Sequence, residues 1–136
     1  MSGFDVLVLG DANPDLVLVG DEVVPAFGQA ERLVDDARMV IGGSGAIFAC
    51  GAAKLGLRVA FAAVVGDDVF GRFMCDQLQA HGVNTSAVAM LPDRATGVTV
   101  VTCLQEDGTP AGLTVNSACA WLSPITPTRG VPLPAL

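Results

Sequence analysis

The sequence predicts an α/β fold in which helices flank a parallel sheet and a smaller β-sheet is appended. Apolar, β-branched runs at residues 4–10 and 58–65 alternate with helical patterns, which is typical of a parallel sheet. Further short strand patterns at residues 16–20, 32–41 and 97–104 predict the appended sheet. At 136 residues, the chain has room for one domain of modest size.

The first strand is expected at residues 4–10, "FDVLVLG", because a continuous apolar run is typical of a strand buried on both faces. The short runs at 16–20 and 32–41 follow. The run "RVAFAAVV" at 58–65 predicts another buried strand, and a shorter one is expected at 87–90.

Two helices are expected between these strands. The first covers residues 44–55, with Ser44 as its N-cap and Gly56 as its C-terminal stop. The second begins after Asp67 or Asp68 and ends at Gly82. Its predicted buried face consists of five apolar side chains, namely Val69, Phe70, Phe73, Met74 and Leu78.

The composition indicates a soluble protein that binds neither nucleic acid nor a membrane surface. The net charge is −7, and the seven basic residues are scattered. Acidic residues flank the first apolar run, so no signal peptide is predicted, and Lys54 and Arg58 interrupt the best apolar stretch. We therefore expect a cytoplasmic protein.

The four cysteines are expected to be free thiols and not metal ligands. No C-x-x-C pair occurs, and the single His81 does not complete a plausible zinc set. The cysteines are Cys50, Cys75, Cys103 and Cys119.

The last part of the chain differs in character from the rest. Residues 108–136 contain five of the eight prolines, no acid, and only Arg129 as a base. Prolines at this density exclude a central strand or a helix interior. We predict two parts: residues 1–107 as the folded part and 108–136 as an atypical tail, either disordered or the product of a shifted reading frame.

The glycine-rich segment "IGGSGA" at residues 41–46 does not fit a phosphate-binding loop. No Gly-Lys-Ser or Gly-Lys-Thr follows it, as a P-loop requires. In a dinucleotide fingerprint starting at Gly43, the third glycine position is Phe48. The first strand instead ends in "GDANPD", which places Asn13 and Asp15 at the edge where open α/β sheets bind ligands. Taken alone, these residues are better explained by ordinary turn chemistry, but next to the glycines they suggest a polyol site.

Several motifs together resemble the ribokinase-like (PfkB) carbohydrate kinases. They are "VLGDANPD", "IGGSGA", "KLGLRVAFAAVVGDDVFG", "LQAHGVN" and "RATGVTVV", and the resemblance covers residues 4–104. It implies a ribokinase-like fold in which the appended strands form a lid over a sugar site and can pair two subunits. It also implies ATP and Mg²⁺ as cofactors, and a sugar or nucleoside as substrate.

By resemblance, Asp15 accepts hydrogen bonds from sugar hydroxyls, Asn13 lies beside it, and the backbone of Gly42 and Gly43 faces the sugar. Asp68 and Gly71 match a further family element, for which helix capping is the simpler interpretation than ligand contact. The family usually has Asn at the position of Ile47, and an aliphatic side chain cannot bond a hydroxyl, so the substrate is expected to differ from an ordinary pentose or hexose.

The resemblance also implies a truncated kinase. Family members are more than twice as long, and their ATP site and catalytic base lie in a D-T-x-G-A-G-D motif that this sequence lacks. No catalytic, ATP-binding or metal-binding residue is therefore assigned here. We predict the substrate-binding half of an ATP-dependent carbohydrate or nucleoside kinase, inactive alone. A non-catalytic sugar-binding or dimerising fragment and a non-functional remnant remain alternatives.

Overall fold

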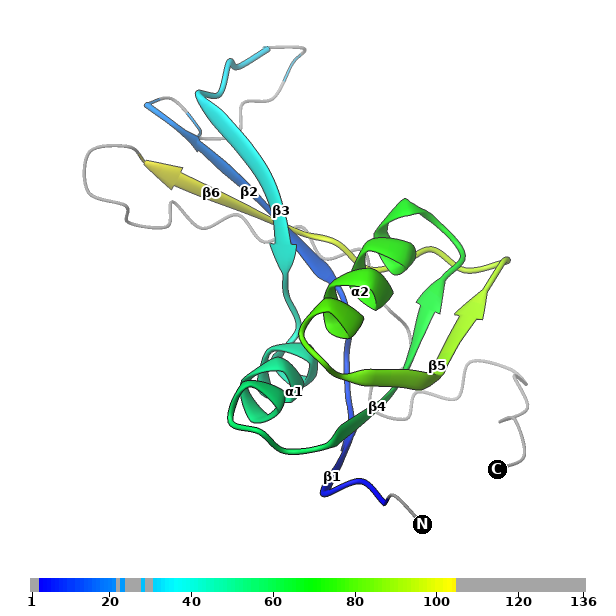
Figure 1. Ribbon diagram of the computed structural model, residues 1–136. Helices are drawn as coiled ribbons and strands as arrows, with labels where there is room; N and C mark the ends of the chain where they lie inside the picture. Colours follow the sequence, from blue (N-terminus) through cyan, green and yellow to red (C-terminus); the bar gives the residue numbers. More distant parts are fainter. Residues whose placement is uncertain (1–2, 22, 24–27, 29–30, 105–136) are drawn as a thin grey trace, which may run out of the picture.

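The computed structural model describes residues 3–21, 23, 28 and 31–104, which form two three-stranded sheets and two helices (Figure 1). In chain order the elements are β1 (Val6–Leu9), β2 (Pro14–Gly20), β3 (Asp36–Ile41), α1 (Ser44–Lys54), β4 (Val59–Gly66), α2 (Val69–Ala80), β5 (Asn84–Leu91) and β6 (Thr99–Leu104). The predicted tail at 108–136 lies outside the described residues.

The first sheet has the order β1-β4-β5, and all of its strands are parallel. Because parallel neighbours need crossover connections, α1 joins β3 to β4 and α2 joins β4 to β5, with both helices packed on the sheet. This arrangement confirms the predicted α/β class with a parallel sheet.

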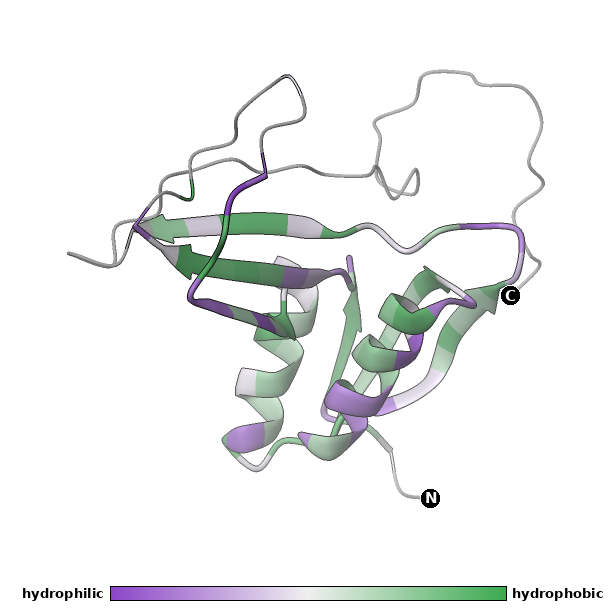
Figure 2. Ribbon diagram, turned by 90° about the horizontal axis from the view of Figure 1, so that it is seen from above, coloured by the Kyte–Doolittle hydropathy of each residue, from purple (hydrophilic) through white to green (hydrophobic). Residues whose placement is uncertain are grey.

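The second sheet has the order β3-β2-β6 and extends away from the helices (Figure 1). In it, β2 pairs antiparallel with β3 and parallel with β6. Strands β2 and β6 are hydrophobic along most of their length (Figure 2). The predicted appended sheet is therefore present, and we call it the lid sheet.

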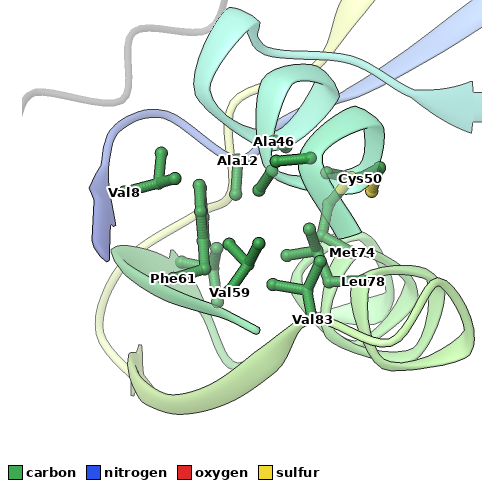
Figure 3. Packing of buried hydrophobic residues seen from close by; sticks show 12 residues of the cluster. Val8, Ala12, Ala46, Cys50, Val59, Phe61, Met74, Leu78 and Val83 are labelled. Atoms are coloured by element: carbon green, nitrogen blue, oxygen red, sulfur yellow. The ribbon is translucent and has the colours of Figure 1, made fainter. Parts of the chain in front are cut away.

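Buried side chains from the parallel sheet and both helices form the core. Phe61 of β4 and Met74 and Leu78 of α2 are all 0% exposed, and they meet Val8 of β1 and Cys50 of α1 (Figure 3). Burial of apolar surface on this scale is the main stabilisation of such a domain.

The structure corrects several predictions about the strands. The first strand is not buried on both faces, because Leu7 and Leu9 are 60% and 77% exposed. Alternate residues of a strand point to opposite faces, and only the face that carries Val6 and Val8 packs against the core. Strand β3 begins at Asp36 and not at residue 32, whereas β2 and β5 are longer than predicted.

The remaining corrections concern the helix starts. Ser44 is the first residue of α1 and not its N-cap; Gly43 takes the cap position and provides no side chain. Val69 was predicted on the buried face of α2 but is 66% exposed as the first helical residue. The predicted stops hold, since Gly56 and Gly82 follow the helix ends with positive φ angles of 89° and 81°.

Candidate functional site

The glycines of the 41–46 segment allow it to lie directly against the connection between β1 and β2. A Cβ atom on Gly42 would collide with the Asp15 carboxylate and with the Asn13 carbonyl oxygen. Gly43 has a φ angle of 81°, which favours glycine, and a Cβ atom there would lie 2.8 Å from the Asp11 carbonyl oxygen. The two segments predicted to form the site are therefore adjacent.

A second close approach fixes the start of α1 against the end of β1. A Cβ atom on Gly45 would lie 3.0 Å from the Cα atom of Gly10, and one on Gly10 would lie 3.1 Å from the Cα atom of Gly45. Such distances are shorter than ordinary van der Waals contact, so only glycine permits the crossing without backbone movement. The helix is thus positioned by backbone contact.

Asp11 takes over the capping role that Gly43 cannot fill. Its Oδ1 atom accepts hydrogen bonds from the Ser44 hydroxyl and from the Gly45 amide, both at 3.4 Å. A carboxylate at this place also interacts favourably with the positive end of the helix dipole. The sequence analysis missed this role, because Asp11 lies 33 residues before Ser44 and capping is normally sought locally.

Asn13 and Asp15 extend the cluster toward the lid sheet. The Asn13 side-chain amide donates to the Thr99 hydroxyl over 3.2 Å. Asp15 is half-buried in β2, between Val40 of β3 and Thr99 of β6 in the sheet register. Thr99 was not predicted as a site residue, although a hydroxyl in the otherwise apolar run at 97–104 was the available signal.

The side chain of Ile47 lies apart from this cluster. It is one turn into α1, is 55% exposed, and lines a cavity of about 490 Å³ between β3, α1 and α2. Asn13, Asp15, Gly42 and Gly43 are not among the residues that line that cavity. The structure thus brings four of the five predicted site residues together, and the fifth, Ile47, lies outside the cluster and lines the neighbouring cavity.

Asp68 caps α2, as the simpler interpretation of the sequence predicted. Its carboxylate accepts from the Gly71 amide, the Thr96 amide and the Thr96 hydroxyl, each at 2.8 Å. Burial alone would raise the pKa of Asp68, but these hydrogen bonds to the charged form outweigh it and lower the pKa. Gly71 packs on the carbonyl oxygen of Gly66, where a Cβ atom would collide.

Carboxylates lie at the starts of both helices in the described part of the chain. A helix N-terminus attracts phosphate through free amides, yet Asp11 lies at the start of α1 and Asp68 at the start of α2. Within the described part of the chain, no group of three His, Cys, Asp or Glu could hold a metal ion. None of the helices described is long and apolar enough to cross a membrane.

A parallel sheet with helices, a lid sheet and a polar cluster where they meet define a class of α/β proteins that bind ligands beside a lid. The sequence matches the pfkB family carbohydrate kinases over residues 4–125. The chain therefore belongs to the pfkB family of carbohydrate kinases, which confirms the resemblance seen in the sequence.

Individual relatives agree with this assignment. Ribokinase of Bacillus subtilis is 32% identical over 119 residues, and the match covers 79% of this chain and 40% of the relative. Deoxyribokinase of Salmonella typhi is 31% identical, with 88% and 38% covered. The 5-dehydro-2-deoxygluconokinase of Shouchella clausii is 36% identical, with 64% and 25% covered.

Solved structures show the same fold. Arabidopsis thaliana ribokinase, complexed with ribose and ATP, superimposes with a TM-score of 0.72 at 27% identity, covering 84% of this chain and 36% of that one. Fructokinase of Halothermothrix orenii gives a TM-score of 0.59 at 28% identity, covering 72% and 33%. The chain spans between 25% and 40% of the length of these relatives.

Proposed function

We propose that this chain carries the acceptor-binding part of an ATP-dependent sugar kinase, the part that holds the hydroxyl compound to be phosphorylated. The observation that carries the proposal is the polar cluster of Asn13, Asp15 and Thr99, which the glycines at 42 and 43 bring against the start of α1. It lies where the lid sheet meets the parallel sheet.

The cluster has the chemistry that a sugar requires. The Asp15 carboxylate can accept hydrogen bonds from two adjacent hydroxyls, while Asn13 and Thr99 each combine donor and acceptor capacity. Bonds to an ionised acceptor are the stronger ones, so Asp15 would contribute most of the polar affinity. Gly42 has no side chain that could cover the carboxylate, which leaves its backbone as one wall of the site.

In this proposal ATP with Mg²⁺ supplies the phosphoryl group, but the described residues hold neither. The carboxylates at both helix starts would repel a triphosphate. The relative solved with ribose and ATP is covered over only 36% of its length, so we place the nucleotide site and the catalytic base outside the matched part. We accordingly propose that the 136-residue chain alone transfers no phosphate, because positioning and charge neutralisation would both be missing.

Ile47 favours a deoxygenated sugar as the acceptor. The resemblance places an Asn at this position, and Ile47 offers no hydrogen bond to a sugar hydroxyl, so an acceptor that lacks this hydroxyl loses nothing here. Two kinds of relatives, deoxyribokinase and 5-dehydro-2-deoxygluconokinase, are named for deoxy sugars. We therefore propose that 2-deoxyribose binds more tightly than ribose. Cytoplasmic location and pairing of two lid sheets stay predictions.

Calorimetry with ribose, 2-deoxyribose, fructose and a nucleoside tests the proposal. We expect binding to the wild-type chain and a loss of about tenfold or more in Asp15→Asn, since a charge-assisted bond contributes on the order of 1.5–3 kcal/mol. Asp76→Asn, on the exposed surface of α2, is the matched control and is expected to bind normally. Equal affinity in Asp15→Asn and wild type would remove Asp15 from the site.

An assay of ADP release, with Mg²⁺ and the same panel, tests inactivity. We expect the rate of ADP release to stay at the background level. Turnover that depends on substrate and disappears in Asp15→Asn would contradict the proposal. A well-folded chain that binds no sugar but forms dimers would favour the dimerising fragment, and a chain without cooperative unfolding would favour the remnant.

A further inference from the structure

The cavity bordered by Ile47 is a candidate for a second site, separate from the polar cluster. It has a volume of about 490 Å³ and lies between β3, the exposed face of α1 and the end of α2. The residues that shape its chemistry are Met39, Ile47, Cys50, Gly51, Lys54 and His81.

One end of the cavity is apolar and the other is basic. Met39 of β3 and Ile47 of α1 lie at the apolar end, whereas Lys54 and His81 lie where both helices end. Ile47 and Lys54 are separated by two turns, or roughly 10 Å along the helix axis. A ligand of several carbon atoms can therefore contact both ends.

The charge of the cavity is opposite to that of the protein. The chain has 14 acidic and seven basic residues, yet none of the residues that line the cavity is Asp or Glu. Burial raises the pKa of the Cys50 thiol, which keeps it neutral, and the positive charge of nearby Lys54 opposes that shift. Lys54 lines the cavity and no lining residue is acidic, so an anion complements the charge at this end.

Gly51 is an independent indication that the space is kept open. It lies in the interior of α1, where glycine destabilises a helix relative to alanine. A Cβ atom built on Gly51 meets no atom within 4 Å, so packing within the described structure does not require glycine there. The missing side chain leaves the cavity wide at this point of α1.

The ring of His81 has a fixed orientation at the basic end. Its Nδ1 atom lies 2.8 Å from the Gln77 carbonyl oxygen, a hydrogen bond that ties the ring to the last turn of α2. Because Nδ1 donates to this carbonyl oxygen, Nε2 of the neutral ring is an acceptor, so Lys54 is the lining group that can bind an anion and the His81 ring forms a wall beside it.

We propose that this cavity binds a small organic carboxylate with a short apolar chain. The carboxylate pairs with the Lys54 ammonium group beside the His81 ring, and the chain passes over Gly51 toward Ile47 and Met39. The site is independent of sugar binding, because its ligand needs no hydroxyl group.

Titration of the full chain with hexanoate, followed by amide chemical shifts, tests the proposal. Hexanoate is expected to shift the amides of residues 47–54 and 77–81 and to bind about tenfold more tightly than acetate or hexanamide, which lack the chain or the charge. Ribose is expected not to compete. Failure of hexanoate to bind at millimolar concentration, or equal affinity for hexanamide, would overturn the proposal whether or not sugar binds.

Two pairs of variants locate the site. Gly51→Leu fills the space with a good helix former and is expected to weaken hexanoate binding about tenfold or more, whereas Gly51→Ala keeps most of the space and stays within about twofold. Lys54→Gln is expected to remove the preference for hexanoate over hexanamide, and Arg72→Gln, with the same charge change elsewhere, is expected to keep it. If Gly51→Leu does not fold, the comparison of Lys54→Gln with Arg72→Gln tests the proposal on its own. A preference for hexanoate over hexanamide that persists in Lys54→Gln, or a dimer that covers the cavity and excludes hexanoate, would refute the assignment.

Discussion

Replacing Asp68 by alanine tests the most connected hydrogen-bond network in the described part of the chain. The carboxylate accepts from the Gly71 amide in the first turn of α2, and from both the amide and the hydroxyl of Thr96. The Thr96 hydroxyl in turn accepts from the Gly66 amide over 2.9 Å. One side chain thus joins the end of β4, the start of α2 and the connection to β6.

The expected loss of stability follows from these contacts. Losing an N-cap costs about 1 kcal/mol, and leaving the Thr96 amide without a partner costs about 1–3 kcal/mol because Thr96 is only 2% exposed. Together, Asp68→Ala should lower the free energy of unfolding by about 2–4 kcal/mol. Domains of this kind are stable by only about 5–15 kcal/mol, so the loss is a large fraction.

Urea unfolding, followed by circular dichroism, measures the loss. Asp68→Asn retains an acceptor oxygen and is expected to lose less than Asp68→Ala. Asp76→Asn, on the exposed surface of α2, is the matched control and is expected to change stability by less than about 0.5 kcal/mol. A change in Asp68→Ala no larger than that of the control would refute the network as a source of stability.

The stabilisation that Asp68 provides is expected to decrease at low pH. Burial favours a higher pKa for Asp68, but the hydrogen bonds from Thr96 and Gly71 outweigh it, so the folded-state pKa lies below the unfolded one. The stabilisation is therefore complete above the unfolded pKa of about 3.9 and is lost as the pH falls through the folded pKa. The difference in stability between wild type and Asp68→Ala should shrink as the pH is lowered below about 4.

Three further predictions concern other parts of the fold. Gly42→Ala places a Cβ atom against the Asp15 carboxylate, so it should lower both the melting temperature and sugar affinity, measured by calorimetry; normal values for both would contradict the close contact. Phe61→Ala should cost about 3–5 kcal/mol in urea unfolding, because Phe61 is 0% exposed. Side-chain and backbone hydrogen bonds from Arg58 lower the pKa of Asp5 to about 2, so its stabilisation should be complete above the unfolded pKa of about 3.9 and be lost as the pH falls from there through 2; NMR titration in wild type and Arg58→Gln measures the pKa.

The sequence predicted the elements whose signals are local. Helix stops at Gly56 and Gly82 and the cap at Asp68 depend on residues within one turn, and all three are present. The exposed face of β1 could not be predicted, because a continuous apolar run does not tell whether one or both faces are covered. Leu7 and Leu9 are apolar, but both helices pack on the other face.

The candidate site was only partly predictable for a related reason. Asp15 and Gly42 were identified by residue type and by their places next to strand ends. Their contact, however, depends on how β2 and β3 pair, and a sequence pattern does not give that register. Thr99 was missed because β6 joins the lid sheet beside β2 from the far end of the described chain.

The carboxylates of Asp11 and Asp68, at the two helix starts, also hold the connections between the parallel sheet and the lid sheet. Three connections join the parallel sheet to the lid sheet: β1 to β2, β3 through the glycine segment to α1, and β5 to β6. Asp11 binds the first connection to the start of α1, and Asp68 binds the third to the start of α2 through Thr96. The second connection is held by its close contact with Asp15. Asp15 is one of these anchors and also belongs to the polar cluster, so a movement of the lid sheet would change the geometry around it, and the sugar binding proposed above would then depend on the position of the lid sheet.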